Sequence, residues 1–439
     1  MRCPMAVEVI GGGLAGVEAA WQIARAGLEV VLHEMRPEVM TPAHRTGLLA
    51  ELVCSNSLGS EHPHSAPGVL KAEMRLLGSV LLECAEEARV PAGRALAVDR
   101  EAFARRVTER IESAARIRVV REEVRHLPEG LVVVATGPLT SPALVEELEG
   151  LTGTGTLYFF DAASPIVTRE SLDLDRMFWG SRYQPHSWDY LNAPLDEEAY
   201  LAFWGALVQA ERHPRHDFEP EHLFEGCLPI EELARRGPDV LRFGPLKPVG
   251  LVDPRTGRMP YAVVQLRRED REGRLFNLVG FQTNLKWSEQ RRVFRMIPGL
   301  ERCEFVRYGV MHRNTYLCAP LVMEPTLVCR RRPSLLFAGQ ITGVEGYMES
   351  AATGILAGLN AARLARGLEP VVPPRDTVLG ALCHYIAEAR PDGFQPMNAS
   401  WGILPPLEHR VRPRRRRREE MARRALGSME VFLRTLANS

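Results

Sequence analysis

The feature that most constrains the fold lies near the N-terminus, where an apolar run leads into a glycine-rich turn and then an amphipathic segment. Glycines stand at positions 11, 13 and 16, the spacing G-x-G-x-x-G. Residues 6–10 predict a buried strand, and residues 14–26 place their apolar side chains on one helical face. In such a unit the first glycine permits the tight turn, the second lets the main chain approach a pyrophosphate, and the third lets helix pack on strand. The sequence therefore predicts a dinucleotide-binding turn formed by Gly11, Gly12, Gly13, Leu14, Ala15 and Gly16.

A second strand and an acidic residue follow at the distance that this turn requires. Gly27 suits the left-handed position after a helix, and residues 29–33 form a second strand pattern. Glu34 ends that strand, where a carboxylate accepts hydrogen bonds from the ribose hydroxyls of an adenosine. We therefore expect Glu34 to contact the ribose of a bound dinucleotide.

Two further strands that run into glycines favour FAD over NAD. Residues 132–136 and 334–338 are apolar runs that lead into Gly137 and Gly339, and the chain carries one full fingerprint. A glycine-rich segment and a helix of small residues follow the second run, and these can bring main-chain N–H groups close to a ligand. The layout resembles two-segment FAD oxidoreductases. Further cofactor contacts are expected from Gly339, Gln340, Gly346 and Tyr347, although ordinary core packing is an equally good interpretation of the tyrosine.

Pattern changes divide the chain into three segments. Residues 1–160 carry the nucleotide-binding pattern, residues 161–330 are rich in aromatic residues and strand-like runs, and residues 331–439 return to the first pattern and end in a basic helix. We expect an α/β fold, in which a Rossmann-like FAD-binding domain built from two chain segments carries an inserted α+β domain.

Composition limits the class of protein and the kinds of site. The chain has 439 residues, of which 45% are hydrophobic and 25% charged, as in ordinary globular proteins. No signal peptide is readable, and no apolar run approaches the roughly 18 residues of a membrane span, so we expect a cytoplasmic protein that does not enter a membrane. The eight cysteines include no C-x-x-C pair, which indicates neither a metal site nor a disulfide framework.

Two cysteines stand in settings that suit chemistry. Cys54 lies in a loop of small polar residues near the nucleotide end of the sheet, where ligands bind in doubly wound folds. Cys227 lies two residues before Pro229, which suits the start of a helix, and a thiol at a helix N-terminus has a lowered pKa. For these two thiols, a role as small buried hydrophobes is an equally good interpretation. It is the better one for Cys84, Cys303, Cys318, Cys329 and Cys383.

Seven motifs, taken in order, resemble the folate- and FAD-dependent tRNA (uracil-5-)-methyltransferases, which make ribothymidine in the T-loop. They are the turn at 11–16 and the segments 34–37, 54–57, 224–232, 244–251, 311–316 and 343–347. The resemblance implies FAD, a one-carbon unit from methylenetetrahydrofolate rather than S-adenosylmethionine, the T-arm of tRNA as partner, and NADH or NADPH as reductant. By resemblance Cys227 matches the thiol that attacks the uracil, and Cys54 matches a second reactive thiol near the flavin. Which thiol takes which part stays open.

The residue types suit this chemistry. Uracil C5 is not nucleophilic until a thiolate adds to C6, and a methylene group placed on C5 needs a hydride to become methyl; cysteine and reduced flavin meet these two needs. His312 and Arg313 are candidates for a folate carboxylate or phosphate.

Positive charge is concentrated locally although the formal net charge is zero. A charge run is often only a solvated face, but five consecutive arginines exceed what solubility requires. We expect RNA phosphates to bind Arg414, Arg415, Arg416, Arg417 and Arg418, with the cluster at 330–332 as the second candidate.

Other functions remain open at this point. One is a related FAD-dependent enzyme that modifies uridine in the tRNA anticodon, whose members are longer, and another is an enzyme acting on ribosomal RNA uridine. A non-catalytic flavoprotein that acts as an RNA chaperone belongs to a different class, and in it both thiols would be dispensable.

Overall fold

A five-stranded parallel sheet forms the centre of the nucleotide-binding body in this computed structural model, which describes residues 6–182, 187–213 and 228–437. The strand order is β16-β7-β1-β2-β6. The strands are β1 (Val7–Ile10), β2 (Val30–His33), β6 (Ile117–Val120), β7 (Val132–Val134) and β16 (Leu335–Phe337). β1 pairs in parallel with both β2 and β7, so the strand that carries the fingerprint lies in the middle of the sheet. The parallel sheet and its order confirm the expected Rossmann-like fold.

Two helices from opposite ends of the chain pack tightly on each other beside this sheet. α1 (Leu14–Arg25) follows the fingerprint turn, and α11 (Tyr347–Ala365) is the expected helix of small residues. A Cβ added at Gly354 would lie 2.2 Å from the Ala15 carbonyl oxygen, and one at Gly358 would lie 2.4 Å from that of Ala19. The small residues of α11 therefore serve helix packing, while its first turn reaches the ligand cleft described below.

One helical pattern of the sequence is split in the structure. The pattern over residues 68–88 becomes α2 (Ala66–Leu76) and α3 (Val80–Glu87). Gly78 takes a φ of +78° between them, and the Ser79 hydroxyl accepts a hydrogen bond from the Leu82 N–H to start the second helix. α4 (Arg100–Glu112) and a small antiparallel sheet complete this region. Its strands are β3 (Ser57–Ser60), β4 (Arg89–Val90) and β5 (Ala95–Val98).

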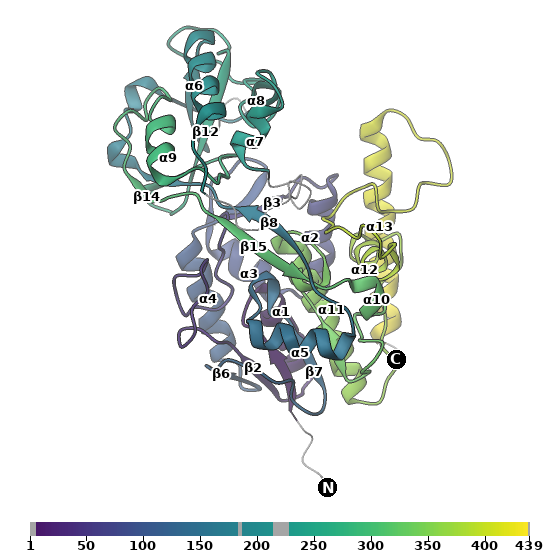
Figure 1. The fold of residues 1–439 in the computed structure, drawn as a ribbon. Helices are drawn as coiled ribbons and strands as arrows, with labels where there is room; N and C mark the ends of the chain where they lie inside the picture. Colours follow the sequence, from purple (N-terminus) through teal and green to yellow (C-terminus); the bar gives the residue numbers. More distant parts are fainter. Residues whose placement is uncertain (1–5, 183–186, 214–227, 438–439) are drawn as a thin grey trace.

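The middle of the chain forms a second body around a six-stranded antiparallel sheet (Figure 1). In the order β10-β11-β12-β13-β9-β14, its strands are Phe178–Gly180, Tyr190–Leu195, Ala262–Arg268, Leu275–Leu278, Ile166–Thr168 and Phe305–Arg307. It also contains the helices α6 (Glu197–Gln209), α7 (Ile230–Arg235), α8 (Val240–Phe243) and α9 (Trp287–Phe294). These elements enclose their own apolar core, separate from that of the nucleotide-binding body.

Two paired strands connect the bodies. β8 (Leu157–Ala162) leaves the nucleotide-binding body, and β15 (Met311–Tyr316) returns beside it in antiparallel register, with Ala162 opposite Met311. Figure 1 shows this pair running between the two bodies. Tyr316, together with Ala319 and Val322 of α10 (Ala319–Val322), already packs in the core of the nucleotide-binding body.

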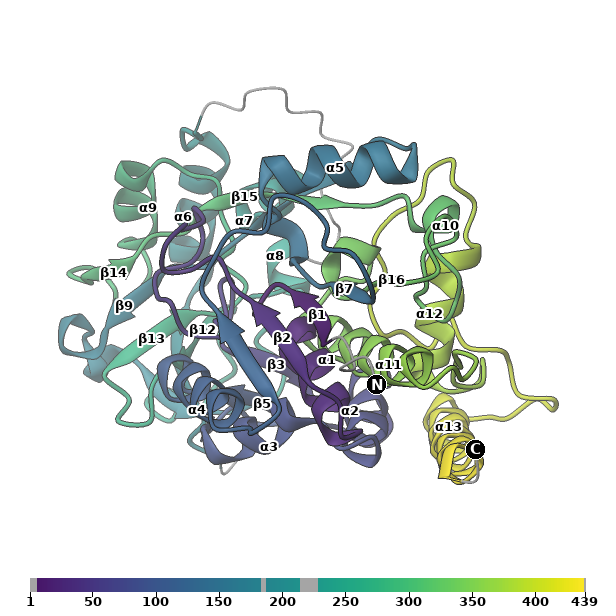
Figure 2. The same cartoon turned by 90° about the horizontal axis from the view of Figure 1, so that it is seen from below.

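The C-terminal segment docks on the nucleotide-binding body rather than extending away from it (Figures 1 and 2). α12 (Val378–Glu388) is followed by α13 (Arg414–Ala437), which packs against α2. Met421, Ala425 and Met429 are buried in this contact. The remaining helix of the first segment is α5 (Pro142–Thr152). In the part of the chain that the structure describes, no helix combines the length and apolar character needed to cross a membrane.

Candidate functional site

The turn after β1 and the first turn of α11 border a cleft of about 1010 Å³, including its open mouth. This size suits a nucleotide cofactor. The expected cofactor residues that line it are Gly11, Gly12, Gly13, Leu14, Ala15, Glu34, Gly339, Gln340 and Tyr347. Gly16 and Gly346 are not among the lining residues, although their sequence neighbours Ala15 and Tyr347 are.

The three fingerprint glycines occupy three different environments, which fit the parts assigned to them. Gly11 has a φ of +104°, and a Cβ there would lie 2.6 Å from the Ala135 carbonyl oxygen. A Cβ on Gly16 would lie 1.8 Å from the Gly11 carbonyl oxygen, so only glycine allows helix and strand to meet here. A Cβ on Gly13 would meet nothing within 4 Å, because this residue faces the cleft. The cradle therefore fits a pyrophosphate at the N-terminus of α1.

Glu34 is fixed in its ionised form at the wall of the cleft. Its carboxylate accepts hydrogen bonds from the Gly12 N–H at 3.0 Å and from the Arg36 N–H at 2.9 Å. The Arg36 guanidinium adds two more, from Nε at 2.9 Å and Nη2 at 3.0 Å. Burial alone would raise the pKa of Glu34, but the hydrogen bonds and charge of Arg36 lower it below its ordinary value. Glu34 is thus held as an anion at the wall of the cleft.

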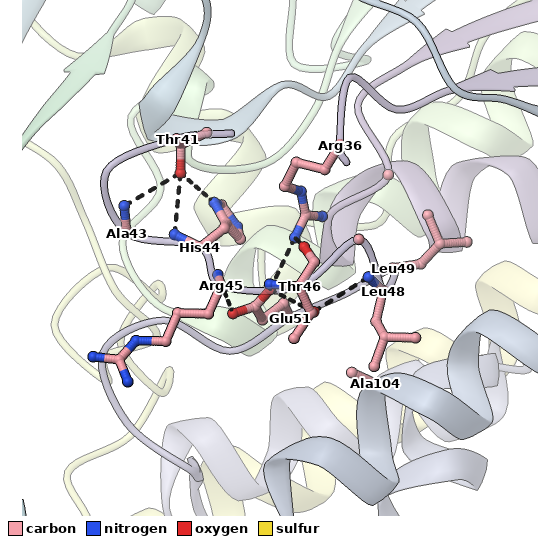
Figure 3. A network of polar contacts seen from close by, with 12 residues as sticks. Arg36, Thr41, Ala43, His44, Arg45, Thr46, Leu48, Leu49, Glu51 and Ala104 are labelled. Atoms are coloured by element: carbon pink, nitrogen blue, oxygen red, sulfur yellow. Dashed lines mark hydrogen bonds and ion pairs between the residues drawn. The ribbon is translucent and has the colours of Figure 1, made fainter. Parts of the chain in front are cut away.

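The loop after β2 is held by a second carboxylate, Glu51 (Figure 3). Glu51 accepts hydrogen bonds from the Thr46 N–H at 3.0 Å, from the Thr46 hydroxyl at 2.8 Å and from the Arg45 N–H at 2.9 Å. Arg36 Nη1 reaches the same carboxylate at 3.1 Å. Arg36 therefore joins Glu34 to the loop, and its position two residues after Glu34 did not reveal this contact.

Cys54 contacts Tyr347, which lines the cleft. The Cys54 Sγ lies 3.0 Å from the Tyr347 hydroxyl oxygen, which also accepts the Cys54 N–H at 2.9 Å and the Ser55 N–H at 3.2 Å. Burial raises the pKa of the Cys54 thiol to about 12, and the Asp161 carboxylate adds to the rise, whereas Tyr347 and Arg100 oppose it. Burial therefore favours the protonated thiol at Cys54.

Both bodies contribute to the position of the Cys54 loop. Arg267 of β12 donates from Nε to the Asn56 side-chain oxygen at 2.8 Å and from Nη2 to the Ser55 hydroxyl at 2.9 Å. Arg307 of β14 donates to the Val53 carbonyl oxygen at 2.5 Å. Arg100 of α4 contacts the Leu52 carbonyl oxygen at 2.9 Å and forms an ion pair with Glu269 of the second body. Sequence spacing gave no sign of these contacts, because the partners lie far apart in the chain.

The other candidate residues are placed as follows. Cys227 lies outside the described residues. His312 lies on β15, and Arg313 is exposed beside it with its guanidinium carbon 4.2 Å from the centre of the Tyr158 ring. The cysteines interpreted as small buried hydrophobes are buried, as expected, which confirms that interpretation for Cys84, Cys303, Cys318, Cys329 and Cys383.

The five consecutive arginines form the first turns of α13, and they divide into two sets. Arg415 and Arg416 form ion pairs with Glu419 and Glu420, one helical turn further on. The other three, Arg414, Arg417 and Arg418, line a groove between α13, the segment 398–412 and the start of α2. Arg410 and Arg412 line the same groove. Positive charge therefore gathers along one surface channel rather than around a free tail.

Comparison with known proteins identifies the family. A family model described as Glucose inhibited division protein A matches residues 6–369. The methylenetetrahydrofolate--tRNA-(uracil-5-)-methyltransferase TrmFO of Moorella thermoacetica is 62% identical over 96% of both chains. The chain belongs to this methyltransferase family. The TrmFO protein of Thermus thermophilus is 57% identical and matches 97% of this chain and 96% of its own.

A solved structure supports the fold of this family member. Aquifex aeolicus GidA superposes with a TM-score of 0.68 at 17% identity, covering 97% of this chain and 73% of the GidA chain. The likeness extends over the parallel sheet and the inserted body alike, which confirms the expected α/β architecture. Membership in the methyltransferase family also confirms the resemblance that the seven motifs indicated.

Proposed function

We infer that the protein methylates C5 of uridine in tRNA, with methylenetetrahydrofolate as the carbon donor and FAD as the cofactor. The observation that carries this conclusion is the identity of 62% over 96% of the chain with a relative named for that reaction. The glycine cradle and the fixed Glu34 carboxylate are what FAD requires. No comparable observation supports an anticodon enzyme, a ribosomal RNA enzyme or an RNA chaperone.

More specifically, we propose that the target is the T-loop uridine and that Cys227 is the nucleophile. Its thiolate would form a bond to uracil C6, which places an electron pair on C5 and O4, and C5 would then attack the one-carbon unit. Loss of the C5 proton would expel the tetrahydrofolate nitrogen from the one-carbon unit and leave a methylene double-bonded to C5, and addition of a hydride to that methylene would make it methyl and release the thiolate from C6. Reduced FAD, when bound, would supply the hydride that turns methylene into methyl, and NADH or NADPH would restore its electrons.

Donor labelling tests this function. Purified protein should transfer label to tRNA from methylenetetrahydrofolate carrying a labelled methylene group, and none from S-adenosylmethionine labelled in its methyl group. Nuclease digestion should place the label in 5-methyluridine, and sequencing of the labelled fragment should place it in the T-arm. Transfer from S-adenosylmethionine would contradict the function, whereas label at another uridine would contradict only the T-loop assignment.

We further propose that tRNA phosphates bind in the groove lined by Arg414, Arg417 and Arg418. A protein without net charge that binds RNA must concentrate positive charge locally, and these arginines point to the same channel as Arg410 and Arg412. The double variant Arg417→Ser/Arg418→Ser should weaken tRNA binding. If both arginines contact phosphate, the slope of log K against log salt should fall by about 1.4 to 1.8.

The matched control is Arg415→Ser/Arg416→Ser, which removes the same charge from residues that are paired with Glu419 and Glu420. Binding of tRNA at several salt concentrations measures both slopes, and flavin content should stay unchanged in each variant. Equal slopes in the two variants would mean that the groove makes no specific phosphate contact, and the cluster at 330–332 would become the candidate.

A further inference from the structure

We propose that Tyr347 is the hydrogen-bond donor that holds Cys54 ready to ionise, which makes it a positioning residue for this thiol. The inference rests on the proposed function only in giving Cys54 a part in the reaction. The residue pair itself is defined by contacts within the protein. Its test can therefore fail while the proposed function stands.

The direction of the hydrogen bond follows from the capacity of a phenol oxygen. A tyrosine hydroxyl has one proton to donate and two lone pairs to accept with. The Cys54 N–H at 2.9 Å and the Ser55 N–H at 3.2 Å occupy both lone pairs of Tyr347. No lone pair is left for an S–H donor, so the contact of 3.0 Å to Cys54 Sγ is made with the phenol donating.

Such a donor stabilises the thiolate more than the thiol. A hydrogen bond to an ionised acceptor is about twice as strong as one between neutral groups. The phenol faces Sγ before any proton has left, so no rearrangement is needed when the thiol ionises. The two main-chain N–H groups keep the donor in this orientation, because turning the O–H toward either of them would place donor against donor and lose that hydrogen bond.

Other charges around the pair work in both directions. Asp161 at the end of β8 and Glu345 before α11 disfavour a thiolate at Cys54, while Arg100 of α4 favours it. Burial raises the pKa of the thiol most strongly, and the Tyr347 hydrogen bond is the first contribution that lowers it. Removing the Tyr347 hydroxyl should therefore raise the pKa of the Cys54 thiol further, because less would oppose the effects of burial and of the two carboxylates.

Tyr347 also connects this thiol to the cofactor cleft. The residue lines the cleft and begins α11, whose following turn contributes Ser350 to the same wall. The Tyr347 side chain thus lines the cleft, and its hydroxyl contacts the Cys54 thiol. A change in what fills the cleft can alter the thiol through this side chain.

The test is the alkylation rate of Cys54 in the FAD-loaded protein. Iodoacetamide reacts with the thiolate, and mass spectrometry of the peptide containing Cys54 separates it from the other cysteines. Tyr347→Phe should slow this alkylation about 10- to 100-fold at each pH from 7 to 9, which corresponds to a shift of about one to two pH units. Incorporation of 3,5-difluorotyrosine at position 347, a more acidic phenol, should speed it.

Tyr316→Phe is the matched control. Tyr316 is also a buried tyrosine, and its hydroxyl donates to the Phe394 carbonyl oxygen at 3.1 Å. This variant should alkylate at the wild-type rate. A purely structural part for Tyr347 would loosen the loop and give faster alkylation in Tyr347→Phe. Faster alkylation, an unchanged rate, or no effect of the fluorinated phenol would each overturn the proposal.

Discussion

Cys227→Ala should keep its FAD and lose tRNA methylation by a factor on the order of 10³ or more. The reason is chemical: without a thiolate at uracil C6, C5 has no electron pair with which to attack the one-carbon unit. In RNA that carries 5-fluorouridine, fluorine replaces the C5 proton that must leave, so the wild type should form an adduct that resists denaturation. Gel electrophoresis of labelled RNA under denaturing conditions measures the adduct.

Cys54→Ala is the informative comparison for this prediction. It should retain the ability to form the 5-fluorouridine adduct, because the nucleophile is still present, even if turnover falls. The opposite pattern, with Cys227→Ala active and Cys54→Ala unable to form the adduct, would exchange the parts of the two thiols. Absence of adduct with both single variants would instead mean that each thiol is needed to reach the covalent step.

Gly16→Ala should destabilise the nucleotide-binding body at the upper end of the about 1–3 kcal/mol that overpacking usually costs, or beyond it. A methyl group at this position would lie 1.8 Å from the Gly11 carbonyl oxygen, which belongs to the main chain and cannot turn aside as a side chain could. Thermal unfolding followed by circular dichroism should show a large fall in Tm, and the purified protein should be colourless.

Two other glycines separate folding from cofactor binding. Gly13→Ala adds a methyl group to open space in the cleft, so Tm without FAD should stay near the wild-type value while FAD affinity falls. Gly150→Ala, in α5 with nothing within 4 Å of the added group, should affect neither. A stable, yellow Gly16→Ala protein would contradict the assigned helix–strand contact.

The parts of the site that follow local rules could be predicted from the sequence. The fingerprint turn and Glu34 are encoded within a single β-α-β unit, where strand, turn and helix dictate which atoms face a ligand. Gly339 and Tyr347 lie in the second chain segment, and the pattern of a strand running into glycine was enough to place them beside the cleft. The tyrosine was expected to contact the cofactor or to pack in the core, and its hydrogen bond to Cys54 carried no local signal.

Contacts between the two bodies could not be predicted from local sequence patterns. Arg267 and Arg307 stand in different strands of the inserted sheet, and neither has a recurring spacing to the Cys54 loop that it holds. The division of the arginine run was also hidden. The rotation of α13 about its own axis, where it packs on α2, decides which arginines pair with a glutamate and which line the groove.

The strand order of the parallel sheet has a consequence for synthesis of the chain on the ribosome. β7 and β16 are neighbours, with Val132 opposite Leu335, but the whole antiparallel body lies between them in sequence. Until that body has emerged, one side of β7 exposes unpaired N–H and C=O groups of an entirely apolar strand. The nascent N-terminal segment is therefore an aggregation-prone species, and the speed at which the middle of the chain folds sets how long it persists.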